Sequence, residues 1–226
     1  MKKLTLDEFN KLSQNALVLA DDEFGKKVLE LSDHTIIKLF RVKRFISQAT
    51  IYSPARRFAK NAQKLIQLNI PTVTILALYN IKNIKRTAVH YQQLEGVMVR
   101  EYLQQHSHCN NDEFLGQLGE FIAILHAKGI YFRSAHFGNI IYTPDKQFGL
   151  IDISDMSISP FSLGMFKRLR NLKHIFRIDE DIKFIQQSHA LENTYLQHYK
   201  INNNQLNNWF KKQFFQTCSK LKLKHQ

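Results

Sequence analysis

The chain has 226 residues, 44% of them hydrophobic, with few glycines and prolines; it is therefore long enough for one large domain or two small lobes and is not expected to be disordered. Its net charge of +13 favours an anionic partner such as a nucleotide, a nucleic acid or an acidic membrane face, without choosing among them.

No window of the sequence approaches the roughly 18–20 consecutive apolar residues that span a bilayer. Charged residues interrupt the N-terminus, so no export signal is expected, and Cys109 and Cys218 match no metal or redox spacing, which predicts free thiols in the cytoplasm.

The chain opens with the pattern of a short helix followed by a small sheet. Thr5 and Glu8 have capping-box spacing, which predicts a helix that ends near Ser13. Three β-like runs follow, and turn residues separate them. They predict a three-stranded antiparallel meander over Ala16–Ala20, Lys27–Leu31 and Thr35–Phe40.

A longer helix and two more strands complete this first part. Ser53 suits an N-cap and Pro54 suits a first helical turn, so we expect a helix from here to about Leu68. Two further strands are expected at Val73–Tyr79 and Arg86–Gln92. The predicted order up to residue 95 is therefore β-β-β-α-β-β.

Helical signals dominate after Gly96. Asn111 or Asp112 can cap a helix whose apolar residues recur at helical spacing up to Leu125. From Phe161 onward the chain reads as helical throughout. A β-rich part followed by a helix-rich part predicts an α+β fold with two lobes, residues 1–95 and 96–226. Short strands interrupt the second part, at Ile130–Phe132, Ile140–Tyr142 and Phe148–Ile151.

The segment from Gly129 to Ser154 carries the most specific pattern. A strand leads into the loop Arg133–Asn139, then a two-strand hairpin, then an apolar run that ends directly before Asp152. This arrangement resembles the catalytic loop and metal-binding segment of the protein-kinase superfamily, with Asn139 at the Asn of H-R-D-x-x-x-x-N and Asp152 at the Asp of D-F-G. The resemblance implies that Asn139 and Asp152 hold Mg²⁺, and an amide and a carboxylate are the hard oxygen ligands that the ion of a bound triphosphate needs.

Two upstream residues extend the same resemblance. The strand ending in Lys38 is similar to the V-A-I-K strand, which implies that Lys38 contacts the α- and β-phosphates of ATP. Gly25 is the one glycine of the first turn, at the place of the phosphate-cradling loop. This turn is the poorest match to the pattern, because it is acidic, whereas such a loop offers bare backbone amides and no carboxylates. The implied fold is a protein-kinase-like one: an antiparallel sheet and one long helix in the first lobe, a mainly helical second lobe and ATP between them. We expect Lys38, Asn139 and Asp152 to converge there.

A narrower resemblance is to bacterial lipopolysaccharide core kinases, including toluene tolerance proteins. It implies a cytoplasmic, ATP-using phosphotransferase that acts on sugars of the lipopolysaccharide inner core. The stretches that carry it are spread over most of residues 25–155: Lys38–Arg41, Ser53–Ala59, Ile70–Thr72, Tyr131–Asn139 and Leu150–Asp152.

Two positions depart from the kinase pattern. The catalytic aspartate position is Ser134, and serine is no general base at neutral pH. His136, two residues on, has an ordinary pKa of about 6.5 that suits a base, although a structural role within the loop is the alternative. Arg133, Ser134 and His136 are the candidate catalytic residues. The helix that follows Ser53 contains no Asp or Glu, so the partner of Lys38 stays open.

These departures leave two functions open. General-base help is typically worth about 10²–10⁴-fold, whereas phosphoryl transfer depends mainly on positioning and charge neutralisation. A slow kinase and a non-catalytic pseudokinase, which binds nucleotide or serves as a scaffold in envelope biogenesis, both agree with the sequence.

The basic residues of the second part have several readings. In Phe161–Arg177, Lys and Arg interleave with apolar residues, as in an ordinary amphipathic helix with a solvated basic face. The same pattern suits a surface for phosphorylated sugars or for the anionic inner face of a bacterial inner membrane, with the protein attached peripherally. Nucleic-acid binding is a weaker third alternative, because no recognised nucleic-acid motif accompanies the charge.

Overall fold

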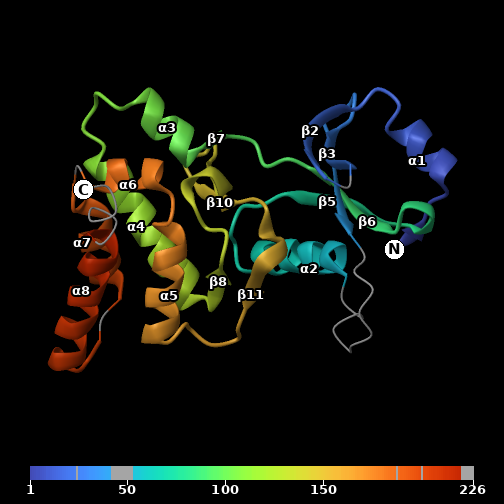
Figure 1. Cartoon of the computed structure of the whole chain (residues 1–226). Coiled ribbons are helices and arrows are strands. Elements are labelled where there is room, and N and C mark those ends of the chain that lie inside the picture. The colour runs from blue at the N-terminus through green and yellow to red at the C-terminus, as the bar shows by residue number, and fades with distance from the viewer. Residues whose placement is uncertain (24, 42–52, 187, 200, 220–226) are drawn as a thin grey trace. The chain divides into compact units, whose positions relative to one another are not determined.

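The computed structural model describes residues 1–23, 25–41, 53–186, 188–199 and 201–219. It divides into two compact units (Figure 1). The first comprises Met1–Leu94 with Asp152–Ser154, and the second comprises Glu95–Ile151 with Asp155–Gln226. Strands dominate the first unit and helices the second, which confirms the predicted α+β class.

The first unit contains a sheet with the strand order β1-β5-β6-β4-β3-β2. Its strands pair antiparallel except for β1, which runs parallel to β5. The antiparallel β2, β3 and β4 confirm the predicted meander. Strand β1 was not predicted, because two residues are too short to show an alternating pattern. The bounds are β1 (Lys2–Lys3), β2 (Leu17–Asp22), β3 (Gly25–Glu30), β4 (Ile36–Arg41), β5 (Thr74–Ile81) and β6 (Arg86–Gln92).

Two helices pack on this sheet, and both begin where the sequence predicts. Helix α1 (Leu6–Leu12) starts with the capping box of Thr5 and Glu8. Helix α2 (Pro54–Gln67) starts at Ser53, whose hydroxyl accepts a hydrogen bond from the Arg56 amide at 3.3 Å. Capping satisfies backbone N–H groups that the first helical turn leaves unpaired.

Strand β4 presents its two faces to different helices. Ile37 and Leu39 belong to the core cluster that includes Phe9 of α1. On the alternate positions, the ring of Phe40 lies 6.3 Å from the ring of Phe58 of α2. Because side chains alternate along a strand, Lys38 lies on the same side of β4 as Phe40.

The second unit holds two small antiparallel sheets, with the orders β10-β9-β7 and β11-β8. Strands β8 and β9 match the predicted ranges, and β10 ends one residue before the predicted end. Strands β7 and β11 were not predicted. The bounds are β7 (Val97–Met98), β8 (Ile130–Phe132), β9 (Ile140–Tyr142), β10 (Phe148–Leu150) and β11 (Met156–Ile158).

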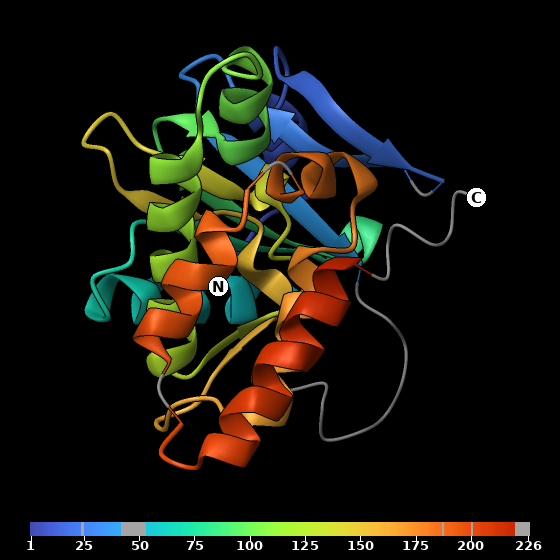
Figure 2. The same ribbon diagram turned by 90° about the vertical axis from the view of Figure 1, so that its left-hand side faces the viewer.

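Six helices make up most of the second unit. Helices α4 and α7 run side by side (Figures 1 and 2), and they approach so closely at Gly119 that a Cβ there would collide with the backbone of Leu191. Helix α8 packs against α5 and α7. No helix in the described part of the chain is long and apolar enough to cross a bilayer. The bounds are α3 (Val99–Gln105), α4 (Asp112–Ala127), α5 (Met165–Ile175), α6 (Asp179–Ile185), α7 (Ala190–His198) and α8 (Asn204–Ser219).

Candidate functional site

Lys38 and Asp152 form an ion pair in the first unit. The Lys38 Nζ atom lies 2.6 Å from the Asp152 Oδ1 atom, although the two residues are 114 positions apart in the sequence. The lysine side chain is 11% exposed and the aspartate side chain 42% exposed. Asp152 is therefore the partner of Lys38 that the sequence left open, and its carboxylate remains accessible from solvent.

The backbone at Asp152 adopts an unusual conformation. Its φ of 51° lies in the left-handed region, which costs a non-glycine residue about 1–2 kcal/mol but which aspartate tolerates better than most. Hydrogen bonds hold the residues on both sides of it. The Ile151 amide donates to the Asn139 carbonyl at 3.1 Å, and the Ile153 carbonyl accepts from the Asn61 amide at 2.7 Å. The conformation of Asp152 is thus imposed by its neighbours.

Helix α2 contributes a buried amide to this region. Asn61 is buried in α2 and reaches the main chain of Ile153. The sequence analysis missed Asn61, because a buried asparagine on a helix belongs to no motif. Its hydrogen bond ties α2 to the residue that follows Asp152.

The Asp152 carboxylate also affects the pKa of Tyr91 on β6. Burial raises the pKa of its hydroxyl, and the negative charge of Asp152 raises this pKa further. The hydroxyl therefore stays protonated and neutral at physiological pH.

In the second unit, Asn139 lies at the end of the loop that starts at Arg133. Its Nδ2 donates to the Ser134 carbonyl at 2.9 Å and lies 3.2 Å from His136 Nε2. Both contacts use the amide nitrogen, so the amide oxygen is the group left to bind a cation. This fits a Mg²⁺ ligand, since the ion takes hard oxygen donors. His136 takes part in the internal bonding of the loop, which agrees with the structural alternative for this residue.

Ser134 has a partner that the sequence analysis did not identify. Its hydroxyl donates to the Asp155 Oδ2 atom at 2.7 Å. The other carboxylate oxygen, Oδ1, is buried and has no hydrogen-bond partner among the described residues. Asp155 is the second carboxylate of the segment after β10, three residues beyond Asp152. Its place three residues after Asp152 was the only signal in the sequence that pointed to Asp155.

The remaining predicted residues are Arg133 and Gly25. Arg133 is exposed at the start of the loop. Its charge, after the larger effect of burial, lowers the pKa of His174 on α5. Gly25 opens β3 opposite Asp22, with a φ of 101°. Asp22 lies 3.6 Å from Arg86 in an ion pair, so one acidic group of this turn is partly neutralised.

A buried carboxylate holds the loop between Arg133 and Asn139 in place. Asp181 of α6 is fully buried and accepts two hydrogen bonds from Arg100 of α3, at 2.7 and 3.2 Å. It also accepts the Phe137 amide at 2.9 Å. The hydrogen bond with Asp181 raises the pKa of the Arg100 guanidinium, against the effect of burial. This ion pair and the Phe137 amide together fix the middle of the loop.

A second buried network holds the strand that leads into the loop. The Asn171 amide of α5 donates to the Phe132 carbonyl at 2.6 Å. Its oxygen lies 3.0 Å from His126 Nε2, so this nitrogen is the protonated one, and His126 Nδ1 accepts from the Tyr195 hydroxyl at 2.8 Å. Burial, followed by the charge of Arg168, lowers the pKa of His126 to about 3. The imidazole is therefore neutral.

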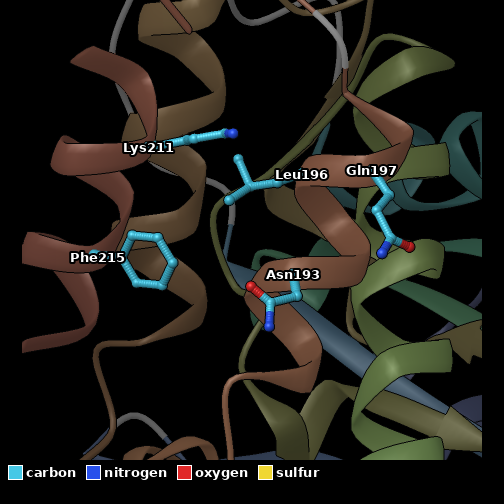
Figure 3. Close-up of a pocket in the computed structure, with 5 residues that line it drawn as sticks. All are labelled: Asn193, Leu196, Gln197, Lys211 and Phe215. Carbon is cyan, nitrogen blue, oxygen red and sulfur yellow. The ribbon is translucent and has the colours of Figure 1, made fainter. Parts of the chain in front are cut away.

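A pocket in the second unit lies away from these residues. It has a volume of about 370 Å³ and opens between α7 and α8 (Figure 3). The predicted site residues are not among its described lining, which offers one amine, two amides and two apolar side chains. The lining residues are Asn193, Leu196, Gln197, Lys211 and Phe215.

Comparison with known proteins gives a distant structural likeness. No protein-family model and no curated protein matches the chain. The structure of the bifunctional kinase-methyltransferase WbdD is similar over 82% of this chain and 46% of that chain, at 14% identity and a TM-score of 0.46. The complex of WbdD with the kinase inhibitor LY294002 is similar over 82% and 47%, at 12% identity and a TM-score of 0.45. The chain thus spans about half the length of these structures.

Proposed function

We propose that this chain is an ATP-dependent phosphotransferase of the protein-kinase-like type, and that its acceptor is a sugar of the lipopolysaccharide core. The observation that carries the proposal is the Lys38–Asp152 ion pair of 2.6 Å. A strand lysine and a post-strand aspartate were singled out from separate motifs. The ion pair joins the residue that the first motif assigns to phosphate binding and the residue that the second motif assigns to metal binding.

The side chains divide the task as follows. Lys38 binds the α- and β-phosphates, and the Gly25 amide adds a neutral donor at the first hairpin. Asp152 and the Asn139 amide oxygen hold Mg²⁺, which supplies charge neutralisation on the phosphates when bound. The net charge of +13 favours an anionic acceptor such as a phosphorylated sugar. The cytoplasm, where ATP is available, is the compartment for this reaction.

A second candidate function is a pseudokinase that binds nucleotide without transferring phosphate, as a scaffold in envelope biogenesis. The observation that favours it is Ser134 at the position of the catalytic aspartate. Such a protein would keep Lys38, Asn139 and Asp152 for binding alone. Nucleotide binding is common to both functions, so binding and transfer must be measured separately.

Thermal unfolding with Mg·ATP tests the binding. A ligand at about 100 times its dissociation constant stabilises the folded state by about 2.7 kcal/mol. We expect a clear rise in melting temperature that is absent from Asp152→Ala and retained by Asp145→Asn, a control at an exposed turn. No rise for the wild type would contradict both functions.

Transfer of radiolabel from ATP to purified core oligosaccharide then separates the two functions. We expect the wild type to label the sugar and Asp152→Ala to lose the labelling. Equal labelling by both proteins would contradict the kinase proposal. Binding without any labelling would favour the pseudokinase.

A further inference from the structure

Ser134 and Asp155 are brought together by a strand pairing in the second unit. Strand β11 begins directly after Asp155, and β8 ends shortly before Ser134. The two strands pair antiparallel, with Met156 opposite Phe132. This register delivers Asp155 to the start of the catalytic loop. The resulting hydrogen bond, from the Ser134 hydroxyl to the Asp155 Oδ2 atom, is 2.7 Å long.

The surroundings of Asp155 are those of a functional carboxylate more than of a structural one. Its Oδ1 atom is buried and lacks a partner among the described residues. Buried polar atoms are nearly always hydrogen-bonded, and exceptions gather at functional sites. His174 Nε2, nearby on α5, is also buried without a partner in the described part of the chain. Asp155 interacts electrostatically with His174. Burial and the charges of neighbouring arginines lower the pKa of His174, and the charge of Asp155 raises it.

We infer that Asp155 supplies the carboxylate that the loop lacks at position 134 and acts as the general base through Ser134. The inference rests on the proposed phosphotransfer. The acceptor hydroxyl oxygen attacks the γ-phosphorus of ATP, and its proton passes to Ser134 Oγ while the Ser134 proton passes to Asp155 Oδ2. The bond between the γ-phosphorus and the bridging oxygen breaks, and ADP leaves with that electron pair. Asn139 keeps the serine in place by its hydrogen bond to the Ser134 carbonyl.

Removing the carboxylate from position 155, and then placing one at position 134, tests this inference. In Asp155→Asn, kcat for transfer to core oligosaccharide should fall by about 10²–10⁴-fold. KM for ATP and the Mg·ATP-induced rise in melting temperature should stay as in the wild type. In the double variant Ser134→Asp/Asp155→Asn the carboxylate moves to the kinase position, and kcat should recover at least about tenfold over Asp155→Asn. A purely structural Ser134–Asp155 contact would not lower kcat at unchanged KM.

Ser134→Ala provides a second variant that keeps Asp155, in case Asp155→Asn does not fold. It should also lower kcat while it leaves Mg·ATP stabilisation intact. Unchanged kcat in either single variant would overturn the inference alone. A wild type that transfers no phosphate would overturn the proposed function together with the inference, so the two failures are distinguishable. Asp145→Asn serves as the matched control.

An independent observation concerns the surface of α5 and α8. Phe161 and Phe166 are 77% and 72% exposed, and Trp209 of α8 is 39% exposed. The rings of Phe166 and Trp209 lie 5.8 Å apart, edge to face. Large exposed aromatic side chains that gather at one place mark an interaction site. Phe166 and Trp209, which are in ring contact, are called the aromatic patch below.

The aromatic patch continues into a basic stripe. Arg170 and Lys173 follow Phe166 at helical spacing on α5, and Arg177 lies in the turn just after the helix. All three residues are exposed. Aromatic rings beside lysine and arginine are the pattern of surfaces that lie in the headgroup region of an anionic bilayer. We propose that the aromatic patch and this stripe bind the surface of a membrane that contains anionic lipids.

Trp209 reports on this directly, because it is the only tryptophan of the chain. Vesicles of phosphatidylcholine mixed with phosphatidylglycerol should shift its fluorescence to shorter wavelength and sediment the protein at low salt. Vesicles of phosphatidylcholine alone should do neither. Phe166→Ser should weaken sedimentation at least about tenfold, whereas Leu76→Ser, at an exposed residue of β5, should not. Sedimentation unaffected by Phe166→Ser, or no binding to the anionic vesicles, would overturn the proposal.

Discussion

The two groups of polar residues are held in place in different ways. In the first unit, Lys38 and Asp152 hold each other, and the carboxylate is 42% exposed. In the second unit, the loop from Arg133 to Asn139 is held by groups that are buried beneath it, of which Asp181 is fully buried. The first arrangement can be rearranged by a ligand that competes for either charge, whereas the second is fixed by the fold.

Under the proposed function, this difference suggests that the two groups have different tasks. A lysine paired with an accessible carboxylate can exchange its partner for phosphate when nucleotide and metal arrive, at little cost to the fold. A loop that must present a proton-transfer group needs a geometry that is set before the substrate binds. Variants of the first group should therefore change ligand binding, and variants of the loop anchors should change stability first.

The largest effect is expected from Asp181→Ala. Removing this carboxylate takes the nearest partner from the Arg100 guanidinium and the acceptor from the Phe137 amide. Breaking a buried ion pair typically costs about 3–5 kcal/mol. Urea denaturation measures the loss of unfolding free energy. Glu180→Ala is the matched control, because Glu180 precedes Asp181, is 64% exposed and lies 3.9 Å from the same arginine. Its removal should cost less than about 1 kcal/mol. Equal losses would break the comparison.

His126 gives the next effect, through pH. Its pKa is lowered to about 3 in the folded protein, whereas an unfolded histidine titrates near 6.5. The unfolded chain therefore binds a proton first, so this contribution to stability is present above about pH 6.5 and is lost as pH falls towards 3, by at most about 1.4 kcal/mol per unit. Unfolding free energies at pH 7 and pH 5 should differ less in His126→Gln than in the wild type.

The exposed His34 provides the control for this experiment, since His34→Gln leaves the buried network untouched. Its variant should show the pH dependence of the wild type. An unchanged pH dependence in His126→Gln would mean that the network of Asn171 and Tyr195 does not hold the imidazole neutral.

Residues whose neighbours along the chain define them could be singled out from the sequence as site candidates. Lys38 ends a run of β-branched residues, and Asn139 and Asp152 stand at fixed distances from short strands. The helix starts at Thr5 and Ser53 were equally local, because capping depends on residues one turn away. The α+β class followed from these elements.

Residues that act through distant partners could not be predicted. Asp155 reaches Ser134 because β11 pairs with β8, and a three-residue strand gives too short a pattern to reveal its partner. Asp181 and Arg100 are 81 positions apart and belong to no motif. Asn61 was not predicted either, because it also belongs to no motif. The groups that support the candidate site were thus missed more often than the groups that form it.

The smallest effect on stability, and the sharpest contrast with Asp181→Ala, is expected from Lys38→Met. Methionine keeps the apolar stem of the lysine, and an ion pair with a partly exposed partner is worth about 1 kcal/mol or less. The urea midpoint should therefore change little, while the Mg·ATP-induced rise in melting temperature is lost. Lys27→Met, at an exposed position of the neighbouring strand β3, should keep both properties. If Lys38→Met instead unfolds the protein as readily as Asp181→Ala and leaves the response to Mg·ATP intact, the lysine is a structural residue and not a nucleotide ligand.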